Sequence, residues 1–519
     1  MFNKLKTSVF NLSHNVTGTA NMGYILPIAC YDVVPGEKIR HSVHALLRTQ
    51  ALLFPLMHTV DIDIDTYFVP DRIIWDDSMD FHSGGDDGLA APVAPTRDYP
   101  VGGYGINSLA DMLGLPVVTY DGSGNPVPVT ASTGTNHSVL PFRAYAKVYN
   151  DYYRDTQLQP EVTISTASGV DTTTNIDLLR PCWKRDYFTK ARPQPQLGPE
   201  VVLPFSGDAP VLGIGLEGTT STVYTNKNPR ESDGTTTAYP FAVDIGDNLS
   251  SQALNIRVQT NSTTAYPDIV ADLEDAAGIS IREQREANAV QRFLEFNNIW
   301  GGRYIEQVWS RFHARVPDYR LDRPEFLGSG SAKFQFSEVL QTAEGTDGGV
   351  GTMAGHGISL VGSNKFRYRT PEHGWILMVL VMRPKAQYLQ GQHRMWNRAT
   401  KYDYLLPEFA HIGDQSIENR ELYVNSANPT DTLGFTPIYE EYRTIPSRVF
   451  GEARTNLDYI HMGRIFTSEP ALNSTLVECV PTDRVFQVGT GVANSVFMNI
   501  QHKVSARRPL PLTPSYKLM

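Results

Sequence analysis

Residues 22–81 hold the feature that most constrains the fold of this chain. Three runs rich in β-branched and aromatic residues follow one another there, separated by Pro35-Gly36 and by Pro55, as expected for consecutive strands with tight connections. In the third run, apolar residues alternate with aspartates. The apolar set is Val60, Ile62, Ile64 and Phe68, and the aspartates are Asp61, Asp63 and Asp65. This period of two predicts the first part of a β-sandwich core, with the aspartate face solvated or against a partner.

A second constraint is the run WILMVLVM at residues 375–382, bounded by Gly374 and Pro384. Eight apolar residues are too few to span a bilayer, which takes about 20, but they are typical of a strand buried on both faces. We therefore place this strand at the centre of the sandwich and predict no membrane insertion. Residues 141–158 and 280–312 have the spacing of helices with one apolar face. The prediction is a mainly β, antiparallel sandwich with long inserted loops and a few helices.

Composition and motifs exclude several functions. The 519 residues are 41% hydrophobic, and a formal charge of −10 argues against a surface wholly devoted to coating nucleic acid. The three cysteines lie far apart, which indicates free thiols. The aspartates at 61, 63 and 65 resemble the start of a calcium loop, but Thr66 and Arg72 replace the required Gly and Glu. Nucleotide-binding, zinc and serine-hydrolase motifs are absent. We predict no enzyme, no cofactor and no metal site.

We interpret the chain as a single domain, residues 1–519, with four attached segments. Residues 1–21 are predicted to form a polar N-terminal arm that lies on a neighbour or on another surface. Residues 82–140 form a long surface loop, and the threonine-rich residues 206–267 form an inserted protrusion. Residues 485–519 form a basic C-terminal segment. Both chain ends are therefore locally basic on a protein that is acidic in total.

Several sequence blocks resemble the major capsid protein of the Microviridae, which are small tailless bacteriophages with single-stranded DNA genomes. The resemblance is closest to the gokushovirus-like branch, and the blocks keep their order between residues 10 and 454. They are NLSH with MGYILPI, VVPGEKIR, LLRTQALLFPLMH, YFVPDRIIWDD, FRAYAKVYNDYYRD, RDYFTKARPQPQLGPEV, PDYRLDRPEFLG, HGWILMVLVMRP, and PEFAHIGDQSI followed by EEYRTIPSRVFGE. The regions without a match are chiefly residues 81–138, residues 163–177 and the threonine-rich insertion.

The resemblance implies an eight-stranded antiparallel jelly roll that self-assembles into a T=1 icosahedral shell around circular single-stranded DNA. It implies a virion protein, assembled in the cytoplasm of a host bacterium. A small basic DNA-binding virion protein and a pilot or minor virion protein are the implied partners. Residues 206–267 occupy the place of a protrusion at the threefold axes, which could contact the host receptor, for example a host surface glycan.

Two groups of basic residues are candidates for DNA contact. Subunits at −10 cannot neutralise DNA alone, so a basic peptide or cations should share that role, and the basic chain ends are expected on the inner surface. This first group is Lys4, Lys6, Lys503, Arg507, Arg508 and Lys517. The weaker group, interleaved with aromatic residues, is Lys184, Arg185, Lys190 and Arg192, for which packing between subunits is the structural alternative. We expect the aspartate face to meet a neighbour's basic residues or solvent.

A second function class stays open on the sequence alone. Loops rich in Thr, Tyr and Asn would also suit a carbohydrate-binding β-sandwich protein or a glycosidase. That alternative predicts a monomer or small oligomer with a concave aromatic site, whereas a capsid protein assembles into particles of megadalton mass.

Overall fold

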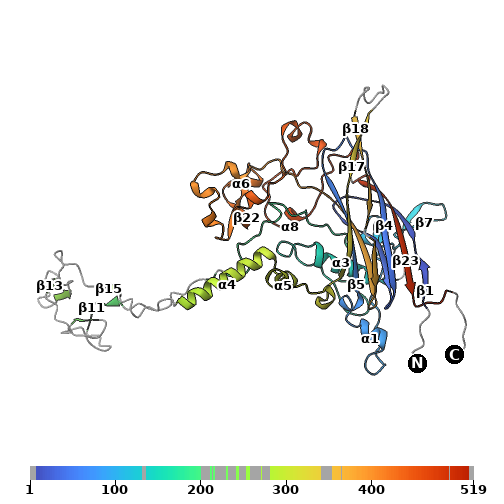
Figure 1. Cartoon of the computed structure of the whole chain (residues 1–519), viewed down its shortest axis with the longest axis horizontal. Helices are drawn as coiled ribbons and strands as arrows, with labels where there is room; N and C mark the ends of the chain where they lie inside the picture. Colours follow the sequence, from blue (N-terminus) through green and yellow to red (C-terminus); the bar gives the residue numbers. More distant parts are fainter. Residues whose placement is uncertain are drawn as a thin grey trace. The chain divides into compact units, whose positions relative to one another are not determined.

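The computed structural model describes residues 7–130, 136–199, 201, 211–212, 214–216, 229–231, 241–244, 253–256, 270–271, 281–340, 353–363, 365–489 and 491–512. The chain divides into two compact units. One unit comprises Met1–Pro195 and Asn298–Met519, and the other comprises Gln196–Asn297. The first unit contains the sandwich drawn in Figure 1.

Two antiparallel sheets form the sandwich. Sheet A has seven strands in the order β1-β23-β4-β18-β17, with β2 also paired to β23 and β19 also paired to β4. Its strands are β1 (Ser8–Asn11), β2 (His14–Ala20), β4 (Lys38–Thr49), β17 (Gln335–Leu340), β18 (Met353–Gly362), β19 (Phe366–Arg369) and β23 (Val496–Arg508). Sheet B has the order β16-β5-β20-β3, with β3 (Ile25–Val33), β5 (Val60–Pro70), β16 (Glu325–Lys333) and β20 (Gly374–Pro384). A mainly β, antiparallel fold is confirmed, while the count of eight strands stays a prediction.

The three strands predicted within residues 22–81 are β3, β4 and β5. The apolar side chains of the alternating run point into the core between the sheets, where Val60, Ile62 and Ile64 have no exposed surface. Inward residues of β4 and β23 complete this core from sheet A. Period-two alternation therefore identified the buried face of β5 correctly.

The apolar run at residues 375–382 is β20, which lies between β5 and β3 in sheet B. Its alternate residues enter two different cores: Ile376 and Met378 pack between the sheets, whereas Leu377 and Val379 pack on the outward side of sheet B. All four are fully buried. The prediction of a central strand buried on both faces is confirmed.

Helix α3 (Leu140–Val148) covers the outward side of sheet B together with the π-helical turn η2 (Tyr149–Tyr153). The aromatic residues at helical spacing, among them Phe142 and Tyr145, are buried in the second core. The Tyr145 hydroxyl donates to the Ile25 carbonyl at 2.8 Å, which attaches the helix to the start of β3. The predicted core-packing helix is therefore present.

The N-terminal segment differs from the expected polar arm. Its described residues form β1 and β2, which both pair with β23 of the same chain, Ser8 opposite Arg508 and His14 opposite His502. The backbone of a polar segment can still complete a sheet edge, because ladder hydrogen bonds do not depend on apolar side chains. The first and last strands of the chain thus lie side by side (Figure 1).

The remaining elements are short, apart from two helices. Helices α4 (Ile281–Trp300) and α5 (Tyr304–Phe312) confirm the helical prediction for residues 280–312, although Ser280 lies outside the described residues. The other helices are α1 (Ser78–Ser83), α2 (Leu109–Met112), α6 (Asn419–Leu422), α7 (Glu440–Arg443) and α8 (Ser474–Val477). Small strand pairs are β6 (Thr96–Arg97) with β9 (His137–Ser138), β7 (Val118–Tyr120) with β8 (Pro126–Pro128), and β21 (Asp414–Glu418) with β22 (Thr432–Pro437).

The second unit contains the whole predicted insertion at residues 206–267, which lies largely outside the described residues. Its described strand pairs are β10 (Val211–Leu212) with β15 (Val270–Ala271), β11 (Ile214–Leu216) with β12 (Pro229–Glu231), and β13 (Phe241–Asp244) with β14 (Ala253–Ile256). Most of α4 also belongs to this unit.

Candidate nucleic-acid interface

The outward side of sheet A carries a group of exposed cations. Side chains alternate along β23, so that Val504 and Ala506 are buried while Lys503 and Arg507 are exposed on the outward side. The same alternation on β4 exposes Lys38 and Arg40 and buries the isoleucine between them. Two strands that are far apart in the sequence therefore turn their cations to one surface.

Strand β19 and the residue before it add three more cations. Lys365, Arg367 and Arg369 are all exposed and occur at every second position. Arg367 pairs with Arg40 across the β19–β4 ladder, and Arg369 pairs with Lys38. We call the seven cations at this end of the strands the basic face. It consists of Lys38, Arg40, Lys365, Arg367, Arg369, Lys503 and Arg507.

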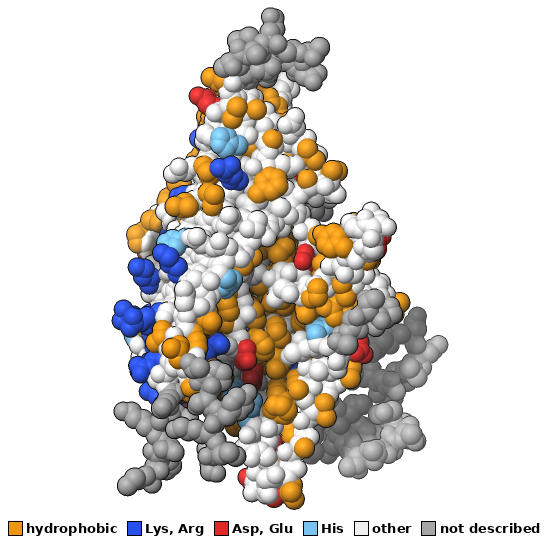
Figure 2. All heavy atoms as spheres, turned by 90° about the vertical axis from the view of Figure 1, so that its right-hand side faces the viewer, with side chains coloured by type: hydrophobic (Ala, Val, Ile, Leu, Met, Phe, Trp, Pro, Cys, Tyr) orange, Lys and Arg blue, Asp and Glu red, His pale blue; other side chains and the backbone are white. Residues whose placement is uncertain are grey.

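A shallow groove of about 800 Å³ runs across the basic face. Arg40, Lys365, Arg367 and Lys503 line it together with small polar residues, His41 and three apolar residues, which are Val9, Phe366 and Val504. Figure 2 shows this side of the molecule, with blue Lys and Arg side chains gathered along one flank of the sheet. Successive outward residues of a strand are about 6.7 Å apart and neighbouring strands about 4.8 Å, so the cations form a two-dimensional array.

The basic face has no carboxylate of its own. Within the described parts of β4, β19 and β23, the outward positions hold no Asp or Glu. Arg507 donates to the Thr7 hydroxyl at 2.9 Å, and no ion pair joins any of the seven cations to a described residue. Like charges opposite each other on neighbouring strands destabilise a sheet by roughly 0.2–1 kcal/mol per pair. Such an array is most stable when an anion binds across it.

The terminal residues predicted to contact DNA occupy different places. Lys503 and Arg507 belong to the basic face, whereas Arg508 points inward and lies 2.7 Å from the carboxylate of the buried Glu37. Lys4, Lys6 and Lys517 lie outside the described residues. The prediction that the terminal group faces DNA remains untested.

Sequence reasoning missed five members of the basic face. Lys38 and Arg40 flank an apolar residue, and KFRYR at residues 365–369 has a cation at every second position. That alternation was the available signal, because cations two residues apart on a strand share a face. The sequence does not show that the two segments become neighbours.

The second predicted basic group is ion-paired within the chain. Its pairs are Lys184 with Asp61 (2.9 Å), Arg185 with Asp155 (4.0 Å), Lys190 with Glu440 (3.7 Å) and Arg192 with Asp414 (2.5 Å). The aromatic neighbours Trp183, Tyr187 and Phe188 are buried, so their rings are not available for base stacking. The geometry favours a structural role for these four basic residues, with their contacts inside one subunit instead of between subunits.

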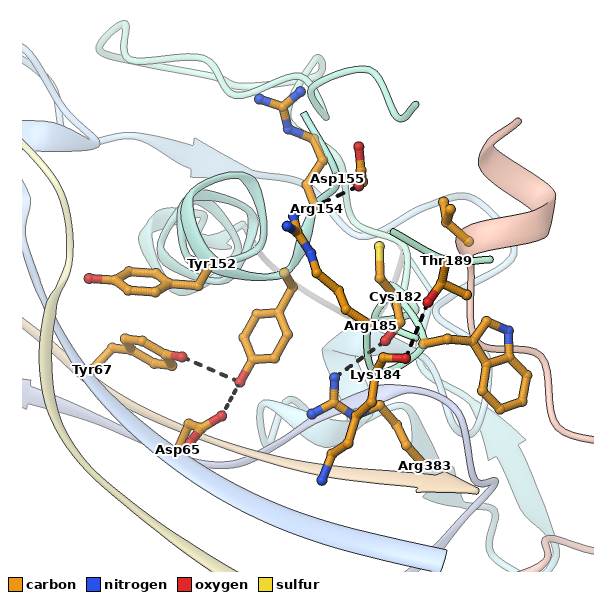
Figure 3. A pocket seen from close by; sticks show the side chains of 13 residues that line it. Asp65, Tyr67, Tyr152, Arg154, Asp155, Cys182, Lys184, Arg185, Thr189 and Arg383 are labelled. Carbon is orange, nitrogen blue, oxygen red and sulfur yellow. Dashed lines mark hydrogen bonds and ion pairs between the residues drawn. The ribbon is translucent and has the colours of Figure 1, made fainter. Parts of the chain in front are cut away.

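The aspartate face of β5 corrects a further expectation. Asp63 lies 2.8 Å from Arg383 and 3.3 Å from Lys184, so the counter-charges come from the same chain and not from a neighbour or solvent. Asp65 accepts from the Tyr153 hydroxyl at 2.7 Å, and burial raises the pKa of the Asp65 carboxyl. Asp65, Lys184 and Arg383 line a pocket of about 320 Å³, which Figure 3 shows with Asp65 and Tyr67 on one side and Lys184 and Arg185 on the other.

Comparison with known proteins gives the family. The sequence matches the family described as "Capsid protein (F protein)" over residues 2–517. The chain belongs to this capsid protein family. It is 30% identical to the capsid protein VP1 of Bdellovibrio phage phiMH2K, with 91% of this chain and 87% of that protein covered. It is 29% identical to the capsid protein VP1 of Chlamydia phage 1, with 93% of this chain and 91% of that protein covered. It is also 30% identical to the capsid protein VP1 of Spiroplasma virus 4, with 91% of this chain and 87% of that protein covered.

Membership in the capsid family confirms the resemblance seen in the sequence and makes this chain a structural protein of a phage virion. The capsid relatives give no support to the carbohydrate-binding or glycosidase alternative. Among the described residues, no helix is long and apolar enough to cross a membrane. No cluster of three or more His, Cys, Asp or Glu side chains in the described part of this capsid protein could hold a metal ion.

Proposed function

We propose that this capsid protein forms a T=1 icosahedral shell around circular single-stranded DNA, with the basic face of sheet A turned toward the genome. The observation that carries the proposal is the array of seven exposed cations without a carboxylate among the described outward residues of its strands. Such an array neutralises phosphates and releases their counterions, which is the main source of sequence-independent affinity for nucleic acid.

The two sides of the sandwich differ in a way that supports this orientation. The outward side of sheet B is covered by α3 and the surrounding loops, which bury a second apolar core. The outward side of sheet A has no such cover among the described residues, and Leu360 and Phe497 on it are 74% and 48% exposed. The described strands nearest the two ends of the chain, β1 and β23, both belong to this sheet. On a chain with a formal charge of −10, the cations are concentrated where a polyanion would bind.

The course of the chain supports an eight-stranded jelly roll within this fold. The strands β3, β4 and β5 alternate between sheets B, A and B, and the chain later passes from β16 in sheet B to β17 and β18 in sheet A, then to β20 and finally to β23. With the terminal strands β1 and β2 set aside, and β18 and β19 counted as one interrupted strand, each sheet contributes four strands. A jelly roll leaves few free edges, which suits a subunit that must not aggregate before assembly.

Further partners belong to the same proposal. The basic face is too small to neutralise a whole genome segment, so a small basic DNA-binding virion protein shares that role, and a pilot or minor virion protein completes the particle. We assign contact with the host receptor, such as a surface glycan, to residues 206–267. Deleting them is expected to abolish adsorption while particles still form, and unchanged infectivity would contradict this receptor role.

The first experiment tests assembly. Electron microscopy and size-exclusion chromatography of the purified full-length chain, produced with its phage partners, are expected to show closed particles of megadalton mass. Cryo-electron microscopy of these particles would give the symmetry and the direction of sheet A. A chain that stays monomeric under all assembly conditions, or particles with sheet A on the outer surface, would contradict the proposal.

The second experiment tests the basic face. The triple variant Lys365→Gln, Arg367→Gln and Arg369→Gln removes three charges and leaves the strand in place. The matched control removes three charges from exposed positions of α4, namely Arg282→Gln, Arg285→Gln and Arg292→Gln. Particles of the first variant are expected to contain less DNA per unit of protein than wild type, and particles of the control to contain the wild-type amount. Equal DNA content in the two variants would contradict a role for this face.

A further inference from the structure

Three imidazole rings lie side by side on the inward surface of sheet A. They belong to three neighbouring strands: His14 on β2, His502 on β23 and His41 on β4. The His14 and His502 rings are stacked at 4.8 Å and 16°, and the His502 and His41 rings at 5.4 Å and 28°. Tyr31 of β3, in the opposite sheet, meets all three rings edge-on at 5.8–6.4 Å. We call these three rings the histidine stack.

The two inner rings are held in their neutral form. His41 and His502 are 2% and 1% exposed. The Nδ1 of His502 lies 3.3 Å from the Nε2 of His41, a contact in which one nitrogen must donate and the other must accept. Burial, with the neighbouring imidazoles as a second cause, lowers the pKa of His41 to about 3 and that of His502 to about 4. One proton can be shared across this contact, but a second would place two N–H groups face to face.

The surroundings offer an imidazolium no counter-charge. From β3 the stack meets the Tyr31 ring and the Ile28 carbonyl, which lies near His502, and from β19 it meets the Phe366 ring. Arg508 of β23 and Glu37, the residue before β4, form a charged pair at 2.7 Å and so satisfy each other. Among the described residues that contact the rings, none is a carboxylate. Protonation therefore has to be relieved by movement of a strand.

Strand β2 is the element that can move. Ala20 is its one buried residue, and His14 and the next three residues are exposed. The strand also lies at the edge of sheet A, where β23 is its single described strand partner. Few apolar contacts and an edge position give a segment a small opening free energy compared with β23, which is paired on both sides.

We propose that the histidine stack is an acid-sensitive latch for the N-terminal strands β1 and β2. At neutral pH the neutral inner rings pack against His14 and hold β2 against β23. When protons accumulate on the stack, charge repulsion between its rings separates the edge strand β2 from β23, and β1 leaves with it. Release would free residues 8–20, while the sandwich stays folded.

Hydrogen exchange of the full-length protein at a series of pH values tests the latch. After correction for the intrinsic exchange rate, amides of β2 are expected to exchange at least about tenfold faster near pH 3.5 than at pH 7, while amides of β20 keep their protection. The variant with both His41→Phe and His502→Phe keeps the ring packing and leaves no titratable group at the two buried positions, and its β2 amides are expected to stay protected. Loss of protection at the same pH in this variant, or no loss in wild type, would overturn the proposal.

A milder variant covers the case in which the double substitution impairs folding. His14→Phe alters the exposed end of the stack and removes one of the neighbouring imidazoles that act on both inner rings. Its β2 strand is expected to open at a lower pH than in wild type. An unchanged pH of opening would show that the stack does not control the strand.

Discussion

Arg143 offers a sharp test of how the helix α3 is attached to the surrounding loops. Its side chain is completely buried, and its guanidinium donates to the Asp171 carboxylate at 2.9 Å and to the carbonyls of Ile74 and Ala167 at 3.0 and 2.9 Å. Asp171, 3% exposed, also accepts from the backbone of Thr173. One cation therefore joins the helix to Ile74 in the segment after β5 and to the loop at residues 163–177. We predict that Arg143→Met selectively loosens this loop.

The expected magnitude follows from what the substitution leaves behind. Removing one partner of a buried ion pair costs about 3–5 kcal/mol, because the other charge stays buried and unpaired. Asp171 keeps hydrogen bonds from Thr173 and Thr174, so we expect the lower end, about 3 kcal/mol. This corresponds to an opening equilibrium roughly 150-fold more favourable.

The pKa of Asp171 gives the same pair a pH dependence. Burial alone would raise this pKa, but hydrogen bonds from Thr174 and Thr173 and from Arg143 lower it to about 2. Because the folded pKa lies below the unfolded value, this contribution is complete above about pH 5 and is lost as the pH falls toward 2. In Arg143→Met the loss is expected to begin at a higher pH.

Hydrogen exchange with mass spectrometry measures the effect locally. Peptides covering residues 165–176 are expected to exchange about 150-fold faster in Arg143→Met, while peptides of β20 stay at the wild-type rate. Arg282→Met is the matched control, because Arg282 is 87% exposed in an i,i+4 pair with Glu286 and such pairs contribute less than about 1 kcal/mol.

Two outcomes would refute this reasoning. An increase of less than about tenfold would show that the pair contributes little. The double variant Arg143→Met with Asp171→Asn is expected to be less destabilised than the sum of the single variants, since it leaves no unpaired charge. Strict additivity would show that the charge pairing is not the cause.

Three further predictions concern the basic face, the buried Asp71, and the aspartates Asp61 and Asp63 of β5. In binding to single-stranded oligonucleotides, each of Lys365→Gln, Arg367→Gln and Arg369→Gln is expected to reduce the slope of log K against log salt by about 0.7, and an unchanged slope in the triple variant would contradict phosphate contact. Burial, with Asp32 and Glu372 as further causes, raises the pKa of Asp71 to about 6. Because the pKa of Asp71 is higher in the folded than in the unfolded protein, ionising this carboxyl destabilises the fold as the pH rises from about 4 to 6. Asp71→Asn should therefore stabilise the protein by up to about 3 kcal/mol at pH 8 and hardly at pH 4, and equal shifts of the denaturation midpoint at both would contradict this. Asp63→Asn weakens the ion pairs with Arg383 and Lys184 and is expected to lower the free energy of unfolding by about 2 kcal/mol. Asp61→Asn, whose partner Lys184 is 45% exposed, is expected to lower it by less than about 1 kcal/mol. Equal denaturation midpoints of the two variants would count against this difference.

Much of the sandwich could be predicted from local sequence patterns. The alternation at residues 60–65 gave the buried face of β5, and the uninterrupted apolar run at 375–382 gave the central position of β20. Both patterns act over a few residues, because successive side chains of a strand point to opposite faces. The arm at residues 8–20 was not recognised as strands, since its pairing with β23 joins positions almost 500 residues apart.

For the charged side chains, too, the local pattern could be predicted and the long-range partners could not. The sequence established that the aspartates of β5 share one face, but their counter-charges Lys184 and Arg383 lie more than 100 residues away. Likewise, the basic character of the two chain ends could be predicted from composition, and the alternation of cations at 365–369 could be read from the sequence. That residues 38–40, 365–369 and 503–507 form one basic face was decided by the register of β4 with β19 and β23. Register depends on which strands pair across the whole fold, and a local period of two does not contain that information.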